Sequence, residues 1–252
     1  MNLPDLYQTF KLMKKHPENY RTLTLVFDHP LHQAQPGQFV MVWLPDVGEK
    51  PYSIAGDDPF SLTVTAVGQF SETLCNLQSG GRIWVRGPLG HGFRISGKRH
   101  LIVGGGYGAA PLFFLAKKAF ERGDAVQVCL GARSSGDLLL LNAFKTVGCD
   151  VKVATDDGSL DQRGLVTNAA ADVLADFNPD TLYACGPLPM LTALAYWCKE
   201  KRLPAQLSWE ALMRCGIGLC GSCELDEDIR QSANLPIGWL TCKDGPVSFS
   251  IL

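Results

Sequence analysis

The sequence has no run of apolar residues long enough to cross a membrane. Its longest apolar stretch, Leu101 to Ala116, is interrupted by four glycines and Pro111, whereas a membrane-spanning helix needs about 20 predominantly apolar residues. The first residues, Met1-Asn2-Leu3-Pro4-Asp5, also lack the apolar core of a signal peptide. We therefore expect a cytoplasmic protein that has no membrane partner.

The chain also lacks an excess of charge of either sign. It has 23 Lys and Arg against 25 Asp and Glu, which gives a formal net charge of −2. Proteins that bind nucleic acid or anionic membranes usually carry a positive excess, so neither partner is expected. Internal repeats and low-complexity linkers are absent from the sequence, and its 252 residues suffice for one large domain or two to three small ones.

Cysteine, in contrast, is plentiful and unevenly distributed. Four of the nine cysteines lie near the C-terminus in the pattern C-x4-C-x2-C, with the fourth after 18 intervening residues: Cys215, Cys220, Cys223 and Cys242. This is the plant-type ligand spacing of a 2Fe–2S cluster. In a reducing compartment, clustered cysteines bind metal more often than they form disulfides. Four others are predicted to be small buried apolar residues: Cys75, Cys129, Cys149 and Cys198.

The order of expected elements divides the chain into three parts and predicts a mixed β plus α/β fold. Residues 1–96 contain short strands separated by turn residues, as in an antiparallel β-barrel, with strands expected over 22–27, 38–44, 61–67 and 82–85. Residues 97–205 alternate strands with helices, which predicts a doubly wound parallel sheet. Residues 206–252 are short Gly- and Cys-rich segments that would need the cluster to hold them together.

Two turns of the predicted parallel sheet are candidate nucleotide sites. The segment from Gly104 to Pro111, Gly-Gly-Gly-Tyr-Gly-Ala-Ala-Pro, follows a strand and opens a helix, whose free N–H groups suit a pyrophosphate. Its spacing differs from G-x-G-x-x-G followed by an acidic residue, which disfavours an ordinary Rossmann dehydrogenase. Cys185-Gly186-Pro187 ends another strand, where a thiol could pack near a nicotinamide ring. Both segments are also compatible with plain turns that bind nothing.

Two segments of the predicted barrel are weaker candidates. In Lys50-Pro51-Tyr52-Ser53, a cation, a ring and a hydroxyl could meet a phosphate, a flavin ring and a flavin heteroatom. From these residues alone, a plain strand with alternating faces is favoured. The segment 68–74 could be a helix N-terminus that receives a second phosphate. It could equally be a capped helix start with Ser71 as N-cap.

Taken in their order along the chain, these motifs resemble those of the ferredoxin–NADP reductase superfamily of flavin reductases: Lys50–Ser53, Gly68–Ser71, Gly104–Pro111 and Cys185–Pro187. Further segments make the chain similar to the electron-transfer subunits of type-B, NAD-dependent dihydroorotate dehydrogenases. These segments are Gly87–Phe93, Thr155–Ser159, Glu210–Cys223 and Cys242–Val247. The resemblance runs from about residue 10 to the C-terminus.

The resemblance implies three cofactors and the residues that bind them. FAD would lie against the barrel, at Lys50, Pro51, Tyr52, Ser53, Val64, Thr65, Ala66, Phe70 and Ser71. NAD(H) would lie over Gly104, Gly105, Gly106, Gly108 and Pro111, near Asp157, Cys185, Gly186 and Pro187. The four C-terminal cysteines would hold the 2Fe–2S cluster. No residue is expected to act as an acid–base catalyst, because the chemistry belongs to the cofactors.

The resemblance also implies a partner and a role in pyrimidine biosynthesis. The family's partner is an FMN-containing (β/α)8-barrel subunit, in a heterotetramer of two of each. The chain would be an NADH-linked oxidoreductase subunit with diaphorase-type activity alone, and without a second barrel it should not oxidise dihydroorotate by itself. Arg133, Ser134 and Ser135 follow the second sheet strand and could bind the 2′-phosphate of NADPH. The resemblance nevertheless implies NAD.

Departures from the family pattern keep two alternatives open. Lys50 stands where the family usually has Arg, the loop between Cys223 and Cys242 is acidic, and the usual Phe after Val247 is displaced by one. The same reductase module could therefore serve another complex, sulfhydrogenase-like or an NADH-dependent ferredoxin oxidoreductase. The second alternative is a zinc protein, although zinc ribbons favour paired C-x2-C knuckles.

Overall fold

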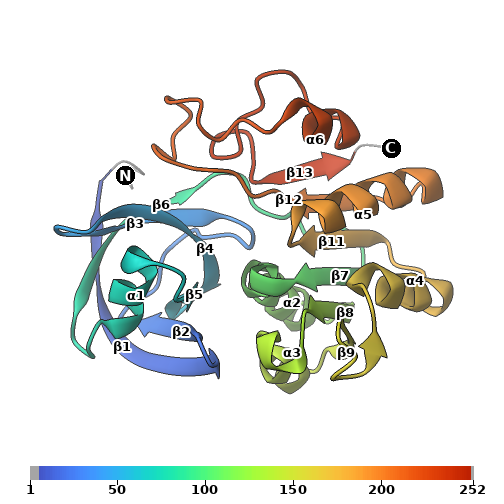
Figure 1. Ribbon diagram of the computed structural model, residues 1–252, viewed down its shortest axis with the longest axis horizontal. Helices are drawn as coiled ribbons and strands as arrows, with labels where there is room; N and C mark the ends of the chain where they lie inside the picture. Colours follow the sequence, from blue (N-terminus) through green and yellow to red (C-terminus); the bar gives the residue numbers. More distant parts are fainter. Residues whose placement is uncertain (1–5, 251–252) are drawn as a thin grey trace.

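The computed structural model describes residues 6–250, and its first part is a closed antiparallel barrel of strand order β1-β2-β5-β4-β3-β6 (Figure 1). The four strands expected from the sequence are present, and two more close the barrel. The additional strands, β1 and β4, have only two buried residues each, which weakens their apolar pattern. The elements are β1 (Gln8–Asn19), β2 (Thr22–Phe27), β3 (Phe39–Leu44), β4 (Gly48–Asp57), β5 (Phe60–Thr65), α1 (Gln69–Asn76) and β6 (Arg82–Leu89).

Strand β3 is apolar along its whole length because both of its faces are covered. Val40, Val42 and Leu44 point into the barrel core. Phe39 and Met41 alternate with them and pack on the outside against Cys223 and Cys242 of the C-terminal segment. Since successive side chains of a strand point to opposite faces, a strand buried on both sides needs a continuous apolar run. Strand β3 is thus the wall shared by the barrel and the cysteine segment.

The second part is a seven-stranded sheet of order β10-β9-β8-β7-β11-β12-β13, parallel except for the last pair. Helices α2 and α3 pack on one face and α4 and α5 on the other, which confirms the doubly wound arrangement. The strands are β7 (Arg99–Gly105), β8 (Ala125–Ala132), β9 (Asp150–Thr155), β10 (Gln162–Arg163), β11 (Thr181–Cys185), β12 (Ala205–Ser208) and β13 (Val247–Ser250). The helices are α2 (Ala109–Glu121), α3 (Leu141–Val147), α4 (Val166–Phe177) and α5 (Leu188–Lys201).

The C-terminal segment is anchored at both ends in this sheet. Strand β12 pairs with β11, and β13 returns to pair with β12, so the segment between them lies over both the barrel and the sheet (Figure 1). The buried Trp209 donates its indole N–H to Ser248 Oγ over 2.7 Å and ties the two ends together. The sequence pattern did not reveal these strands, because each has only four residues. One short helix, α6 (Glu227–Ser232), lies within the segment.

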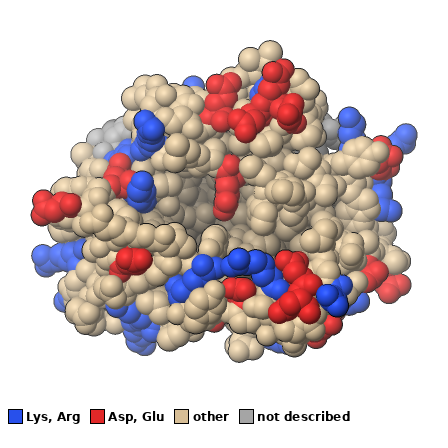
Figure 2. Space-filling view, viewed as in Figure 1, with Lys and Arg blue, Asp and Glu red and all other residues tan. Residues whose placement is uncertain are grey.

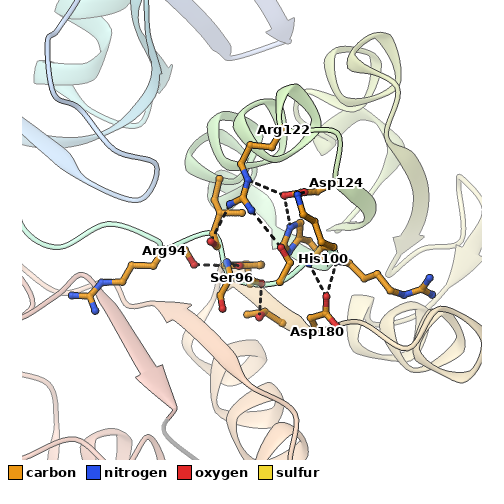
Figure 3. Close-up of polar contacts among 12 residues, drawn as sticks. Arg94, Ser96, His100, Arg122, Asp124 and Asp180 are labelled. Carbon is orange, nitrogen blue, oxygen red and sulfur yellow. Dashed lines mark hydrogen bonds and ion pairs between the residues drawn. The ribbon is translucent and has the colours of Figure 1, made fainter.

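A polar network around one buried pair, His100 and Asp124, connects the beginnings of the sheet strands (Figure 3). The side chains of His100 and Asp124 are fully buried, with Nε2 and Oδ2 3.1 Å apart. Lys98 and Arg122 also contact the Asp124 carboxylate, at 2.8 and 3.1 Å. The carboxylate of Asp180 accepts the backbone N–H groups of Lys98 and Arg99. The network lies at the opposite end of the sheet from the glycine turns. Within residues 6–250, no helix is long and apolar enough to cross a bilayer.

Asp124→Asn should destabilise the sheet domain, because it removes the charge that His100, Lys98 and Arg122 share. Loss of one partner in a buried charged network costs about 2–4 kcal/mol, measurable as a lower free energy of unfolding in urea at pH 7. The control is Asp176→Asn, at an exposed position of α4. Equal stability of the two variants would contradict a stabilising role for the network.

The same variant should change how stability depends on pH. Burial raises the pKa of Asp124, but the hydrogen bonds from Lys98 and His100 and the charge of Arg122 outweigh it, so the pKa is lowered. The stabilisation is therefore complete above the unfolded pKa of about 3.9 and is lost as the pH falls through the folded value. The wild-type advantage over Asp124→Asn should shrink below about pH 4. An advantage that stays constant to lower pH would contradict this assignment.

Candidate functional site

The four C-terminal cysteines come together as two pairs of thiols. Cys223 and Cys242 are buried, with their Sγ atoms 3.2 Å apart. Cys215 and Cys220 hydrogen-bond to each other, and Cys215 lies close enough to Cys242 to influence its ionisation. Among residues 6–250, no three His, Cys, Asp or Glu side chains converge as ligands of a single metal ion. Two adjacent pairs fit a 2Fe–2S cluster, in which each iron takes two thiolates.

Backbone N–H groups surround these sulfurs. Gly218 N donates to Cys242 Sγ over 3.1 Å, and Leu219 N approaches Cys215 Sγ at 3.4 Å. Burial raises the pKa of Cys215, but N–H groups of residues 217, 220 and 219 outweigh it and lower the pKa. Hydrogen bonds from Ser222 lower the pKa of Cys220 to about 6. The lowered pKa values of Cys215 and Cys220 thus favour the thiolate form, which is the form that binds iron.

In the buried cysteine pair, Cys223 and Cys242, the thiol form of Cys242 is favoured instead. Burial, together with the neighbouring Cys223, raises the pKa of Cys242 to about 12. Two thiols in van der Waals contact inside an apolar pocket cannot both ionise without a positive counter-charge. An iron ion bound between them would supply that charge. The observed thiol geometry therefore suits a metal-bound state of this pair.

The candidate flavin residues lie along β4, β5 and the start of α1. Lys50 and Ser53 are exposed on β4, and the Tyr52 and Phe70 rings are stacked 6.1 Å apart, which offers an aromatic face. Pro51, Thr65 and Ala66 are partly buried. Val64 points into the barrel core, so only its backbone is available to a ligand.

Ser71 is not the N-cap of α1, as one interpretation of its sequence predicted. The helix begins at Gln69, its N-cap is Gly68, and Ser71 is the third helical residue. Its hydroxyl accepts the N–H groups of Val67 and Gly68 and donates to the carbonyl of Gly68. The side chain therefore caps the helix from inside, and glycine leaves the helix N-terminus open to a ligand.

The two candidate nucleotide turns are packed directly against each other. A Cβ on Gly108 would collide with the carbonyl of Cys185, and a Cβ on Gly186 would lie 3.0 Å from Gly105 Cα. These contacts explain why both turns need glycine. They lie at the carboxyl ends of β7 and β11, the edge where open α/β sheets bind ligands.

A pocket of about 550 Å³ opens beside these turns, where the surface in Figure 2 is hollowed between the barrel and the sheet domain. Of the predicted residues, Gly105, Gly106, Gly186 and Pro187 line it. Gly104, Gly108 and Pro111 lie beneath, in the turn and in α2. Burial, with a smaller contribution from Glu210, raises the pKa of Cys185 to about 12, so its thiol is neutral. Asp157 is exposed and binds Ser159, and its neighbour Asp156 lines the pocket instead.

Three further charged residues of this pocket were not among the predicted nucleotide contacts. Arg21 reaches it from the barrel, at the turn between β1 and β2, and lies 3.8 Å from Asp137. Asp137 also accepts hydrogen bonds from Tyr20 and Ser134. Glu210 lines the pocket from the C-terminal segment. Asp137 follows β8, the second strand of the sheet domain along the chain, and an acidic residue after that strand is a sequence signal for binding of a nucleotide ribose. For Arg21, no sequence signal indicates that it lies beside the sheet domain.

Residues 210–250 match the family model described as the iron–sulfur cluster binding domain of dihydroorotate dehydrogenase B. The chain is 43% identical over 212 residues to the probable dihydroorotate dehydrogenase B (NAD(+)) electron transfer subunit of Thermococcus kodakarensis, covering 84% of this chain and 83% of that protein. The protein of the same name in Methanothermobacter thermautotrophicus is 34% identical over 255 residues, covering 99% and 90%.

Solved structures have the same arrangement of parts. A structure described as an NADH-dependent reduced ferredoxin-NADP oxidoreductase matches with a TM-score of 0.81 and 29% identity, over 99% of this chain and 90% of that one. A ferredoxin reductase of carbazole 1,9a-dioxygenase matches with a TM-score of 0.67 over 78% of this chain and 66% of that one. At 22% identity it shows the fold alone.

Cys223→Ala should remove the cluster without removing the flavin site. The variant deletes half of the buried thiol pair, so we expect iron to fall from about two atoms per chain to below about 0.2, measured with sulfide after anaerobic purification. Cys198→Ala is the matched control, since it removes a buried thiol elsewhere in the core. Iron content at the control's level in Cys223→Ala would contradict the ligand assignment.

Proposed function

The chain belongs to the family of dihydroorotate dehydrogenase B electron transfer subunits, and from this premise we propose that it carries electrons between NAD(H) and a catalytic partner subunit. Its cofactors are FAD, a 2Fe–2S cluster and NAD(H). When bound, the flavin exchanges a hydride with the nicotinamide and single electrons with the cluster. The observation that carries the proposal is the convergence of four cysteines as two pairs. The buried pair, Cys223 and Cys242, packs against β3, the outer wall of the barrel.

The residues of the chain would bind and orient these groups. The exposed Lys50 is available to flavin phosphate, and the Tyr52 and Phe70 rings to the flavin ring system. Lys50 supplies a point charge where Arg would supply a planar fork, so its grip on phosphate is less directional. The packed turns around Gly105 and Gly186 let the dinucleotide approach the backbone closely. Cys185, neutral and buried at the floor of these turns, contributes shape and no charge.

The proposed partner is an FMN-containing (β/α)8-barrel subunit, in a heterotetramer of two of each. Two features near the cluster support a docking surface. Leu219 is 80% exposed beside the exposed Cys220, and Leu212 is 65% exposed. Acidic side chains gather at the top of Figure 2, and residues Glu227 and Asp228 begin α6 there. An apolar centre with a charged rim is the usual composition of a protein interface.

A second candidate is the same module in another NADH-linked ferredoxin oxidoreductase complex. It is favoured by the match to the NADH-dependent reduced ferredoxin-NADP oxidoreductase structure over 99% of this chain. Co-purification from the native host distinguishes the two: an FMN-containing partner that oxidises dihydroorotate supports the first, and a ferredoxin-reducing partner supports the second.

The isolated chain should oxidise NADH with an artificial electron acceptor but form no orotate from dihydroorotate. The described residues form one barrel, and its candidate ligand residues are those for FAD. Addition of the FMN subunit should restore dihydroorotate-dependent NAD+ reduction, measured at 340 nm. The Cys223→Ala variant is the control, because it should keep the diaphorase activity and lose the coupled reaction. Substantial orotate formation by the isolated chain would contradict the proposal.

Asp137→Asn should weaken the preference for NADH over NADPH. Hydrogen bonds from Ser134 and Tyr20 lower the pKa of Asp137, so the nucleotide pocket contains a carboxylate at neutral pH. A carboxylate accepts ribose hydroxyls and repels a 2′-phosphate. Once the charge is removed, Arg21 and Arg133 can attract the 2′-phosphate of NADPH without competition from a carboxylate. The ratio of kcat/KM for NADPH to that for NADH should therefore rise about tenfold, which corresponds to about 1.4 kcal/mol. An Asp176→Asn control should leave the ratio unchanged, and an unchanged ratio in Asp137→Asn would contradict this role.

A further inference from the structure

Arg86 joins the flavin barrel to the backbone of the cluster loop. It lies on β6, and its side chain is only 12% exposed. One of its terminal nitrogens, Nη2, donates to the carbonyl oxygen of Cys215 over 3.0 Å. Cys215 is 129 positions further along the chain and begins the C-x4-C segment. A guanidinium of one part of the protein thus holds the first residue of the cysteine loop in another.

The same guanidinium also forms an ion pair with Glu49 of β4. Arg86 Nε and Nη2 lie 2.9 Å from Glu49 Oε1 and Oε2, a two-pronged ion pair across β3. The Tyr7 hydroxyl donates to Glu49 Oε1 over 2.7 Å, and the Tyr7 ring lies 5.8 Å from the guanidinium carbon. Arginine in such a fork has one preferred orientation. Because Glu49 precedes Lys50, the fork connects the candidate flavin strand to the cysteine loop.

The direction of the Cys215 carbonyl affects the N–H groups that follow it. The N–H groups of residues 217, 219 and 220 point at Cys215 Sγ, and Gly216 can adopt its φ of +73° because it has no side chain. Its missing Cβ would lie 2.8 Å from Met41 of β3. The loop is therefore held between β3 beneath it and Arg86 at its first carbonyl. Hydrogen bonds to sulfur and nearby positive charge both stabilise a reduced cluster.

We propose that Arg86 is a positioning residue for the cluster: it fixes the Cys215 carbonyl, keeps the following N–H groups directed at sulfur, and thereby raises the cluster's reduction potential. Glu49 orients Arg86 and ties the cluster to the flavin strand. This inference rests on the proposed 2Fe–2S cluster. It goes further by assigning control of the cluster's reduction potential to Arg86, a residue outside the cysteine segment.

The test compares Arg86→Gln, Arg86→Lys and a control, Arg82→Gln, in the full chain purified anaerobically with its cofactors. Arg82 lies on the same strand with an exposed side chain. Cluster and flavin potentials are measured in one redox titration, the cluster by electron paramagnetic resonance and the flavin by absorbance. Arg86→Gln should lower the ratio of reduced to oxidised cluster about tenfold at a fixed potential, which is about 59 mV for a one-electron couple. Arg86→Lys, which keeps the charge without the fork, should show a smaller shift in the same direction.

The flavin potential separates positioning of the cluster from general damage to the fold. It should stay at the wild-type value in all three variants, as should the cluster potential of Arg82→Gln. A cluster potential and resonance spectrum in Arg86→Gln identical to the control would overturn the inference. If Arg86→Gln does not retain its cluster, Arg86→Lys decides: a lowered potential supports the inference and an unchanged one overturns it. Absence of iron from the wild-type chain would instead refute the proposed function.

Discussion

The arrangement of this protein depends on burying strand β3 on both faces. Val40 and Val42 complete the barrel core, while Phe39 and Met41 form the surface on which the buried cysteine pair rests. Each large apolar side chain buried in this way contributes about 1.5–3 kcal/mol. Neither the barrel nor the cysteine segment can shift without exposing part of that strand. Strand β3 thereby joins the barrel, which carries the candidate flavin residues, to the buried cysteine pair.

The candidate nucleotide pocket depends on a second close contact, between two glycine turns of the parallel sheet. Gly108 and Gly186 allow the turns to pack backbone to backbone, which forms the floor of the pocket. Its walls come from elsewhere: Arg21 belongs to the barrel and Glu210 to the C-terminal segment. All three parts of the chain therefore contribute to the pocket. The proposed electron transfer between NAD(H), FAD and the cluster would require such a shared geometry, because each cofactor must lie close to the next.

The sequence reveals the parts of this protein whose residues are close together along the chain. The cysteine spacing, the glycine turn and the apolar run of β3 are local patterns, and each corresponds to the expected element. Strands β12 and β13 are too short to show a pattern, although they anchor the cysteine segment. Arg86 and Arg21 belong to contacts between distant segments, which side-chain type and spacing do not specify. Of the two interpretations of residues 68–74, the one with Ser71 as N-cap is wrong, because Ser71 caps the helix from its third position.

The most direct test of the account is an anaerobic titration of the isolated chain with NADH, followed by electron paramagnetic resonance of the cluster. A hydride donor delivers electrons in pairs to the flavin, so a reduced cluster can arise only by transfer of single electrons from the flavin. The account predicts a cluster signal in the absence of any partner. It also predicts uptake of up to about 1.5 equivalents of NADH, since FAD takes two electrons and the cluster one. Bleaching of the flavin by one equivalent, with iron present but no cluster signal, would contradict it.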